Sequence, residues 1–194
     1  MESQDYIVIS LGGSLIVPDQ VDVEFLKSFI DNIKKYVDQG FRFVIITGGG
    51  HTARAYINAS KSLTNPSVTD LDWIGIAITR VNAELLRVAF GGMSHDSIIM
   101  DPDQIHNTDK SVLVGAGWKP GNSRDLAAVH AAKSVGAKKV INLSNIDYAY
   151  DKDPKKFPDA QIIKESSWPD FRAILPKEWG PGLNAPFDPI AAKE

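Results

Sequence analysis

Residues 41–51 read Phe-Arg-Phe-Val-Ile-Ile-Thr-Gly-Gly-Gly-His. A short run of β-branched and aromatic residues enters three consecutive glycines, and a segment with helical potential follows. This layout is typical of a buried parallel strand that opens into a loop at its carboxyl end. Because glycines carry no Cβ, a ligand can approach the main chain there and bind its N–H groups. A tight turn whose glycines serve only packing is the alternative, and the stretch alone does not decide between the two.

The composition is that of an ordinary globular domain. The chain has 194 residues, of which 43% are hydrophobic and 23% charged, with a net charge of −3. This length suits one domain with a sizeable core, and the charge balance shows no basic excess for nucleic acid or a membrane surface. The polar start, Met1–Asp5, does not resemble a secretory signal, and no apolar run approaches the roughly 20 residues of a membrane span. We therefore expect a cytoplasmic protein without nucleic-acid or membrane partners.

Several catalytic schemes are excluded by residues or motifs that the chain lacks. It has no cysteine, which excludes disulfides, thiolate metal sites and cysteine nucleophiles. Its four histidines (His51, His95, His106 and His130) do not follow a metal-ligand spacing. The chain has no Gly-x-Ser-x-Gly elbow, no P-loop ending in Gly-Lys-Ser/Thr and no Gly-x-Gly-x-x-Gly. If the protein handles nucleotides, it uses another scheme.

The first 60 residues contain two strand–loop–helix units in tandem. Tyr6–Leu11 is a predicted buried strand, Gly12–Ser14 is its loop, and Val23–Val37 carries an apolar helical face. The second unit is the strand of residues 41–47, followed by Gly48–Gly50 and a helix through Thr52 to about Ser60. Parallel strands with helical crossovers bring consecutive loops to one edge of the sheet, where open α/β proteins bind ligands.

The remainder of the chain continues this alternation without a domain linker. Ser123 is a predicted N-cap with Asp125 in the first turn of the helix that follows, and Asp188-Pro189 is typical of the start of a last helix. The predicted elements are a helix over Asp70–Phe90, a weaker strand over Ser97–Met100, a strand over Ser111–Val114, a helix over Arg124–Val135, a strand over Lys139–Leu143, a short strand over Gln161–Lys164 and a short helix over Trp168–Leu175.

A polar loop follows the strand that ends at Leu143. Residues 145–156 interleave aromatic side chains, carboxylates and lysines. Such a loop can hold a base by stacking and a phosphate by charge. A solvated hairpin is the alternative, and the loop alone does not exclude it.

Six motifs follow one another in a fixed order over nearly the whole chain. They are Leu11-Gly12-Gly13-Ser14-Leu15, Thr47-Gly48-Gly49-Gly50 followed by Ala53-Arg54-x-Tyr56, the helical segment Asp72–Ala83, Pro120-Gly121-x-Ser123-x-Asp125, Asn145-Ile146-Asp147-x-x-Tyr150-x-x-Asp153-Pro154-Lys155, and Asp188-Pro189-Ile190-Ala191-Ala192-Lys193. In these motifs the chain resembles the amino acid kinase family and, within it, the archaeal-type uridylate (UMP) kinases. The resemblance implies an α/β fold, a three-layer αβα sandwich around a mainly parallel sheet. Residues 1–194 would form one domain, with an acceptor-binding half over about 1–110 and an ATP-binding half over about 111–194.

The same resemblance implies transfer of the ATP γ-phosphoryl group to UMP, with Mg²⁺ carried by ATP and a homo-oligomeric assembly. The implied residues near the transferring phosphoryl group are Gly12, Gly13, Ser14 and Asp125. Those implied for the acceptor are Gly48, Gly49, Gly50, Arg54, Asp72, Ser123 and Arg124. Those implied for ATP are Asn145, Asp147, Tyr150, Asp153, Pro154 and Lys155. No metal site made of protein ligands is implied, and Mg²⁺ is expected near Asp125.

Two positions distinguish the chain from other members of that family. His51 follows the triple glycine, whereas isopentenyl phosphate kinases typically continue with Ser-Phe-Gly-His. Ser10 stands two residues before the first glycine pair, where the amino-acid kinases commonly have lysine. Archaeal-type UMP kinases also lack that lysine, so both positions favour this subgroup.

Three departures from the subgroup's pattern leave other functions open. Arg124 replaces the second threonine of Thr-Thr-Asp, where it adds a phosphate-binding fork or changes the acceptor. Tyr148 replaces a glycine and would be strained if that position required a positive φ. The family continues beyond Ala-Ala-Lys, so we expect an incomplete carboxyl-terminal part with an uncovered sheet edge. The alternatives are a non-catalytic nucleotide- or phosphate-binding protein on the same fold, and a kinase of this family with another acceptor.

Overall fold

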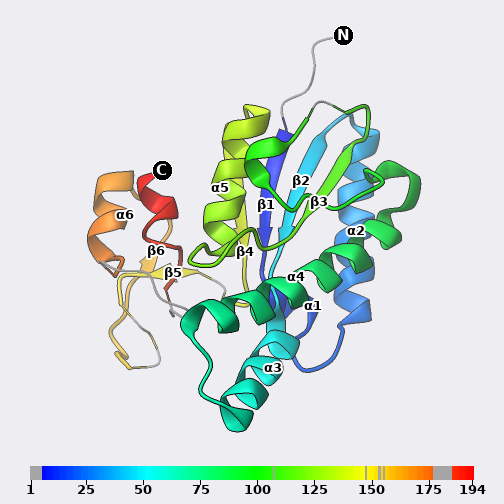
Figure 1. The fold of residues 1–194 in the computed structure, drawn as a ribbon. Helices are drawn as coiled ribbons and strands as arrows, with labels where there is room; N and C mark the ends of the chain where they lie inside the picture. The colour runs from blue at the N-terminus through cyan, green and yellow to red at the C-terminus, as the bar shows by residue number, and fades with distance from the viewer. Residues whose placement is uncertain (1–5, 107, 147, 153, 155, 177–184) are drawn as a thin grey trace.

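The centre of the molecule is a four-stranded parallel sheet (Figure 1). The computed structural model describes residues 6–106, 108–146, 148–152, 154, 156–176 and 185–194. The strands lie in the order β3 (Val112–Gly115), β2 (Arg42–Thr47), β1 (Tyr6–Leu11) and β4 (Lys139–Leu143). All three neighbouring pairs are parallel, so the carboxyl ends of the strands share one edge of the sheet.

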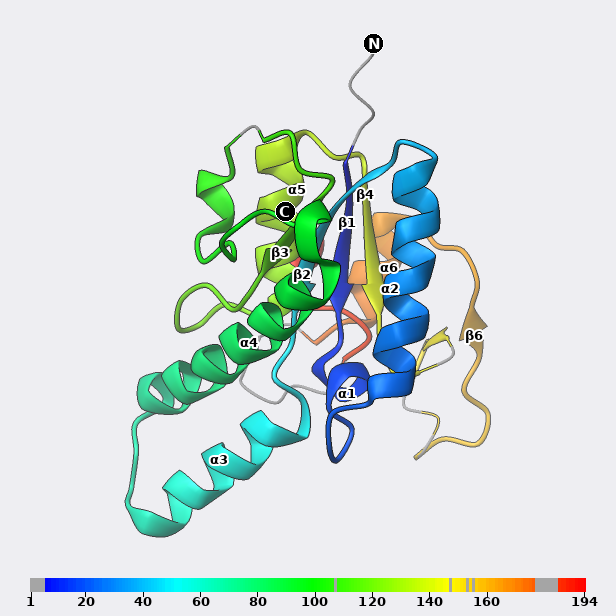
Figure 2. The same ribbon diagram turned by 90° about the vertical axis from the view of Figure 1, so that its right-hand side faces the viewer.

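Helices cover both faces of this sheet, so the predicted three-layer αβα sandwich is confirmed (Figure 2). One face packs against α2 (Val23–Asp38) and α4 (Val68–Phe90), and the other against α5 (Arg124–Val135). The shorter α1 (Gly13–Ile16) and the helix α3 (Gly50–Leu63) begin directly after β1 and β2. Both helices therefore start at the carboxyl edge of the sheet.

The sheet has one hydrophobic core on each face, because successive side chains along a strand point to opposite faces. In β1, Ile9 and Leu11 face α2 and α4, whereas Tyr6 and Val8 face α5. The same alternation puts Ser10 on the α5 face, where it is fully buried. A buried hydroxyl requires a hydrogen-bonding partner, and only the α5 side can supply one.

Helix α5 is buried on two sides. Ala127, Ala128 and Ala131 pack against the sheet, while Leu126 faces the carboxyl-terminal segment. Alanine is the best helix former and its small side chain permits close approach of the helix to the strands. Ser123 caps this helix as predicted, since its Oγ accepts a hydrogen bond from the backbone N–H of Leu126 (3.1 Å).

Helix α4 begins earlier than the predicted Asp70. Its N-cap is Ser67, whose Oγ accepts from the N–H of Asp70 while the Asp70 carboxylate accepts from the N–H of Ser67. This reciprocal arrangement is a capping box, and the hydrogen bonds from the hydroxyl and N–H of Ser67 lower the pKa of the Asp70 carboxyl group.

None of the helices in the described part of the chain has the length and apolar character that crossing a membrane requires.

The predicted strand at Ser97–Met100 is wrong, because in this segment only Ile99 forms an isolated bridge, to Gly115 of β3. The N–H of Ile99 donates to the carbonyl of Val114 (2.8 Å), and Ser94 pairs with Val112. Two short 3₁₀ helices, η1 (Gly91–Met93) and η2 (Pro102–Gln104), flank the segment.

The carboxyl-terminal segment packs against the outer side of α5. It contains a two-stranded antiparallel ribbon of β5 (Ala149–Tyr150) and β6 (Ile162–Ile163), then α6 (Trp168–Ile174) and the 3₁₀ helix η3 (Ala191–Lys193). Oδ1 of Asp188 accepts from the N–H of Ile190 (2.6 Å) and of Ala191 (3.0 Å), but the N-cap of η3 is Ile190 rather than the predicted Asp188. The element that follows Asp188 is a 3₁₀ helix rather than the predicted α-helix.

We predict that Leu86→Ala lowers the free energy of unfolding by about 3 kcal/mol, because it removes buried methyl groups and leaves a cavity. Leu86 lies in α4 and is 0% exposed. Urea unfolding followed by circular dichroism measures the change. Leu63→Ala is the matched control, since Leu63 is 86% exposed at the end of α3, and it should cost less than about 0.5 kcal/mol. Equal losses for both variants would contradict the described core.

Candidate active site

The order of the strands reverses between β1 and β4. The chain passes from β1 to β2 through α2 on one face, and from β3 to β4 through α5 on the other. In open α/β sheets, ligands bind outside the carboxyl ends of the strands at such a switch point. Here the N–H of Gly12 donates to the carbonyl of Leu143 (2.8 Å), so the loop after β1 touches the end of β4. The glycine loops therefore lie where the topology predicts a ligand.

The glycine loops after β1 and β2 are in direct main-chain contact. A Cβ on Gly13 would lie 2.1 Å from the nitrogen of Gly50 and 2.6 Å from the carbonyl carbon of Gly48. Gly50 has a φ of +65°, which favours glycine, and the N–H of His51 donates to the carbonyl of Val17 (2.8 Å). The two predicted phosphate loops are thus one composite surface that a larger residue at position 13 would disrupt.

Helix α3 begins at this composite surface. No side chain caps it, and its first turn contains no acidic residue. The positive end of the helix dipole therefore faces the loops without compensation, which favours an anion. Arg54, in the second turn, is exposed and donates from Nη1 to the Oγ of Ser14 (3.3 Å). Two residues predicted from different motifs, Arg54 and Ser14, thus lie together.

A buried polar network lies beneath the loops on the α5 side. The Oγ of Ser10 donates to Oδ1 of Asp125 (2.6 Å) and accepts from Nε of Arg124 (2.6 Å). Nη2 of Arg124 also donates to Oδ1 of Asp125 (3.1 Å) and to Oδ1 of Asn142 (3.0 Å). The network connects β1, α5 and β4, so it joins both sides of the switch point. A buried carboxylate is tolerated here because a guanidinium and a hydroxyl satisfy it.

Asp188 ties the carboxyl-terminal segment to this network. Its backbone N–H donates to Oδ2 of Asp125 (3.3 Å), and its Oδ1 accepts from the N–H groups of Ile190 and Ala191. Its Oδ2 is buried and has no hydrogen-bonding partner among the described residues. A buried carboxylate oxygen without a partner is costly, so this atom marks a position where a ligand group or cation would be favourable.

The predicted acceptor residues Asp72 and Ser123 lie at the loop between β3 and α5. Oδ2 of Asp72 accepts a hydrogen bond from the N–H of Gly121 (2.8 Å), which joins α4 to the loop before α5. Ser123 uses its Oγ to cap α5. Both residues are half-buried and border the same loop, which the sequence motifs did not specify.

Three polar residues that belong to the sequence motifs, but for which no role at the site was predicted, support the loops. The Nδ2 of the buried Asn82 donates to the carbonyl of Gly48 (2.8 Å). The single O–H of Thr47 is shared between the carbonyls of Thr79 (3.0 Å) and Gly115 (3.1 Å), and Oγ1 of Thr79 accepts from the N–H of Gly117. The role of Asn82 could have been predicted from the sequence, because Asn82 is a polar residue on the apolar face of a long helix. Such a residue requires a buried hydrogen-bonding partner.

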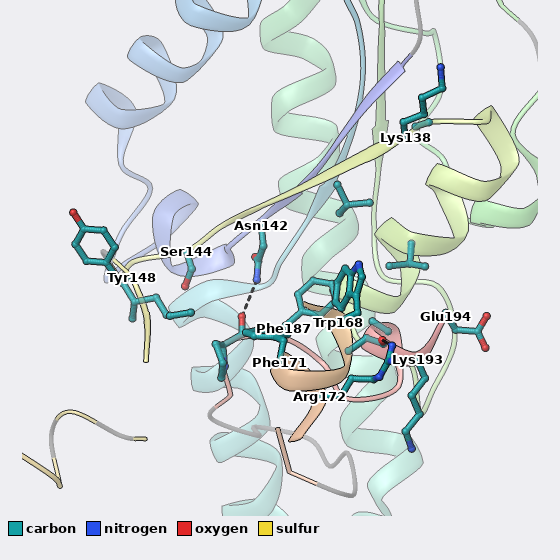
Figure 3. A pocket seen from close by; sticks show the side chains of 18 residues that line it. Lys138, Asn142, Ser144, Tyr148, Trp168, Phe171, Arg172, Phe187, Lys193 and Glu194 are labelled. Atoms are coloured by element: carbon teal, nitrogen blue, oxygen red, sulfur yellow. Dashed lines mark hydrogen bonds between the residues drawn. The ribbon is translucent and has the colours of Figure 1, made fainter. Parts of the chain in front are cut away.

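A cavity of about 620 Å³ lies beside the network, between β4 and the carboxyl-terminal segment (Figure 3). Asn142, which accepts from Arg124, also lines this cavity, so the cavity adjoins the switch point. Its walls combine aromatic and basic side chains, namely Tyr148, Trp168, Phe171, Phe187, Lys138, Arg172 and Lys193. Aromatic faces and cations together suit a nucleotide, because bases stack and phosphates bind cations.

The predicted ATP residues are only partly described. Asp147, Asp153 and Lys155 lie outside the described residues. Asn145, Tyr150 and Pro154 are described and do not line the cavity, whereas their neighbours Ser144, Ile146 and Tyr148 do. No described non-glycine residue has a positive φ, so Tyr148 is accommodated without backbone strain.

The described residues do not bring three His, Asp or Glu side chains together as a metal site. Both oxygens of Asp125 already have protein partners. Within this network, the unpartnered Oδ2 of Asp188 is therefore the carboxylate oxygen left for a cation.

The chain is similar to curated uridylate kinases from archaea. It is 34% identical over 190 residues to the uridylate kinase of Thermococcus sibiricus and 36% identical over 190 residues to that of Thermococcus gammatolerans. Each alignment covers 96% of this chain and 84% of the relative.

Solved structures show the same relationship. The crystal structure of uridylate kinase from Archaeoglobus fulgidus matches with a TM-score of 0.81 and 31% identity, covering 96% of this chain and 84% of the other. The UMP kinase of Bacillus anthracis shares the fold, with a TM-score of 0.73 and 17% identity. The model of the amino acid kinase family matches residues 5–193, nearly the whole chain. The chain belongs to the amino acid kinase family.

Proposed function

We propose that the protein transfers the γ-phosphoryl group of ATP to UMP, giving ADP and UDP. One observation carries this proposal: the two glycine loops form one surface at the switch point, with Arg54 beside Ser14 and Arg124 beside Gly12 and Gly48. The similarity to uridylate kinases at 34–36% identity supports UMP as the acceptor.

The acceptor is assigned to the side of β2 and α3, within about residues 1–110. Main-chain N–H groups of Gly49 and Gly50 and the guanidinium of Arg54 would bind the UMP phosphate, because this surface combines a helix N-terminus with a cation. Asp72, near the ribose, would complete the acceptor side together with Ser123 and Arg124, which reach it from the start of α5 in the other half.

ATP is assigned to the side of β4, within about residues 111–194. The cavity beside Asn142 accommodates part of a nucleotide, and its aromatic wall with Trp168 and Phe171 suits a base. The polyphosphate would then point toward the network at Asn142 and Arg124. The predicted contacts of Asn145, Asp147, Tyr150, Asp153, Pro154 and Lys155 with ATP remain part of this proposal.

The reaction requires positioning and charge neutralisation rather than covalent catalysis by the protein. An oxygen of the UMP phosphate attacks the γ-phosphorus of ATP, a new P–O bond forms, and the bond to the β-phosphate oxygen breaks as ADP leaves. The main chain of Gly12, Gly13 and Ser14 lies between the two assigned sites and would hold the group in transit. Asp125 organises this centre through Ser10 and Arg124. Bound Mg²⁺, with Asp188 nearby, would neutralise charge on the ATP phosphates.

We further propose that the protein acts as a homo-oligomer in the cytoplasm, where both substrates are available. The exposed face of α4 carries a stripe of large apolar side chains, which are Trp73, Val81, Leu85 and Val88. Their spacing places them along one side of the helix, which suits helix packing against a second copy.

The acceptor test measures phosphoryl transfer from ATP·Mg²⁺ to UMP, CMP, isopentenyl phosphate and small carboxylates. We expect UMP to have the highest kcat/KM, because the site offers a phosphate cradle with a carboxylate, Asp72, nearby for a ribose hydroxyl. Binding of UMP without turnover of any acceptor would replace the kinase assignment with a non-catalytic nucleotide-binding role. A higher kcat/KM for another acceptor would correct the substrate.

Arg54→Ala is predicted to raise the KM for UMP by about 10-fold or more and the KM for ATP by less than about 2-fold. The variant loses one charge-assisted contact to the acceptor phosphate, and such contacts contribute about 1.5–3 kcal/mol. Initial-rate kinetics with each substrate varied in turn measures both constants. Lys61→Ala is the control, since it removes an exposed cation from the last turn of the same helix. Equal changes in both KM values would refute the assignment of Arg54 to the acceptor.

A further inference from the structure

The Arg124 side chain is held in one orientation by three different elements. Its Nε donates to Ser10 in β1, and its Nη2 donates to Asp125 in α5 and to Asn142 in β4, at 2.6, 3.1 and 3.0 Å. A guanidinium is planar, so contacts from Nε and Nη2 also fix the position of its third nitrogen. The side chain is 23% exposed, which leaves little room for another rotamer.

The third nitrogen, Nη1, lies over the seam between the two glycine loops. A Cβ on Gly12 would be 3.3 Å from it, and a Cβ on Gly48 would be 3.4 Å from it. Gly12 follows β1 and Gly48 follows β2, so one nitrogen borders both loops at once. In the described part of the chain, this nitrogen makes no hydrogen bond to protein. Its two N–H groups are therefore available to a ligand at the seam.

We propose that Arg124 binds the phosphoryl group while it passes from donor to acceptor, as an arginine finger built into the same chain. This inference rests on the proposed kinase function and changes the role of Arg124 from an acceptor contact to a catalytic residue. During transfer, charge is spread over the equatorial oxygens of the phosphoryl group, and a fixed guanidinium stabilises that charge. The seam lies between the assigned UMP and ATP sites, where this group must pass.

Arg54 and Arg124 have different roles because their surroundings differ. Arg54 is exposed, and among the described residues its side chain hydrogen-bonds only to Oγ of Ser14, at 3.3 Å, so it suits the binding of a phosphate from solvent. Arg124 is preorganised by three partners before any substrate arrives. A preorganised charge acts most strongly where charge develops in the transition state. Loss of Arg54 is therefore expected in KM, and loss of Arg124 in kcat.

Ser10 is the positioning residue for Arg124. Its hydroxyl contacts both Nε of Arg124 and Oδ1 of Asp125 at 2.6 Å, so it sets the height of the guanidinium above β1. The same geometry implies that a cation attached at position 10 would reach the space that the guanidinium occupies. A charge moved from position 124 to position 10 should therefore recover part of the lost rate.

The experiment compares the full chain with Arg124→Met, Arg124→Lys, Arg124→Thr and the double variant Ser10→Lys/Arg124→Thr in steady-state UMP kinase assays. We expect Arg124→Met to lower kcat by about 100-fold or more with the KM for UMP within about 3-fold. Arg124→Lys should retain more activity, because it keeps the charge but not the fork. The double variant should exceed Arg124→Thr in kcat by at least about 10-fold, given the charge it restores. Lys27→Met, which removes an exposed cation paired with Glu24, is the control.

Each outcome either supports the inference or overturns it. A rise in the KM for UMP at unchanged kcat would return Arg124 to the acceptor site. If thermal melting shows that both proteins are folded and the double variant is no more active than Arg124→Thr, the charge at the seam does not contribute to catalysis. If Arg124→Met does not fold, Arg124→Lys and the double variant decide the question. If the unmodified protein turns over no acceptor, the proposed function fails separately. In that case, calorimetric titration with pyrophosphate tests whether Arg124 binds phosphoryl groups. Arg124→Lys should bind pyrophosphate more weakly than the unmodified protein, and unchanged affinity would overturn the inference.

Discussion

The structure depends on a main-chain contact that only glycine permits. Gly13 touches the loop Gly48–Gly50 so closely that a Cβ would lie 2.1 Å from a backbone nitrogen. This contact sets how the loop after β1 lies against the loop after β2, and both α1 and α3 begin from it. The phosphate-binding surface is therefore a property of two loops together. Side chains around it add charge, while the main chain supplies the shape.

The buried network below the loops turns this surface into a candidate catalytic centre. Ser10 is buried on the α5 face because of its place in the alternation of β1, and Asp125 and Arg124 lie opposite it at the start of α5. Removing either charged partner would leave the other without its opposite charge in a largely buried site, which is unfavourable. The network thus stabilises the fold and orients a guanidinium toward the loops. The contact from Asp188 to Asp125 makes the carboxyl-terminal segment part of the same centre.

Much of the fold could be predicted from the sequence, because local patterns determine single elements. The bounds of β1, β4 and α5 agree with the predictions, since apolar runs and the Ser123 cap mark them clearly. The predicted start of α4 is too late, because the capping box of Ser67 precedes the regularly spaced apolar residues from which the helix is predicted. The site required more than local patterns. Ser10 and Asp125 are 115 positions apart in the chain, and no local rule connects a strand hydroxyl to a helix carboxylate at that separation.

The most direct test of the composite loop compares Gly13→Ala with Gly92→Ala. A Cβ at position 92 has no atom within 4 Å, so Gly92→Ala controls for the substitution itself. Because displacement of the loops by about 1 Å can cost 100-fold in rate, we expect Gly13→Ala to lose at least about 100-fold in kcat/KM for UMP. Gly92→Ala should stay within about 2-fold of the unmodified protein. A Gly13→Ala protein that keeps its kcat/KM would contradict the claim that main-chain contact between the two loops builds the site.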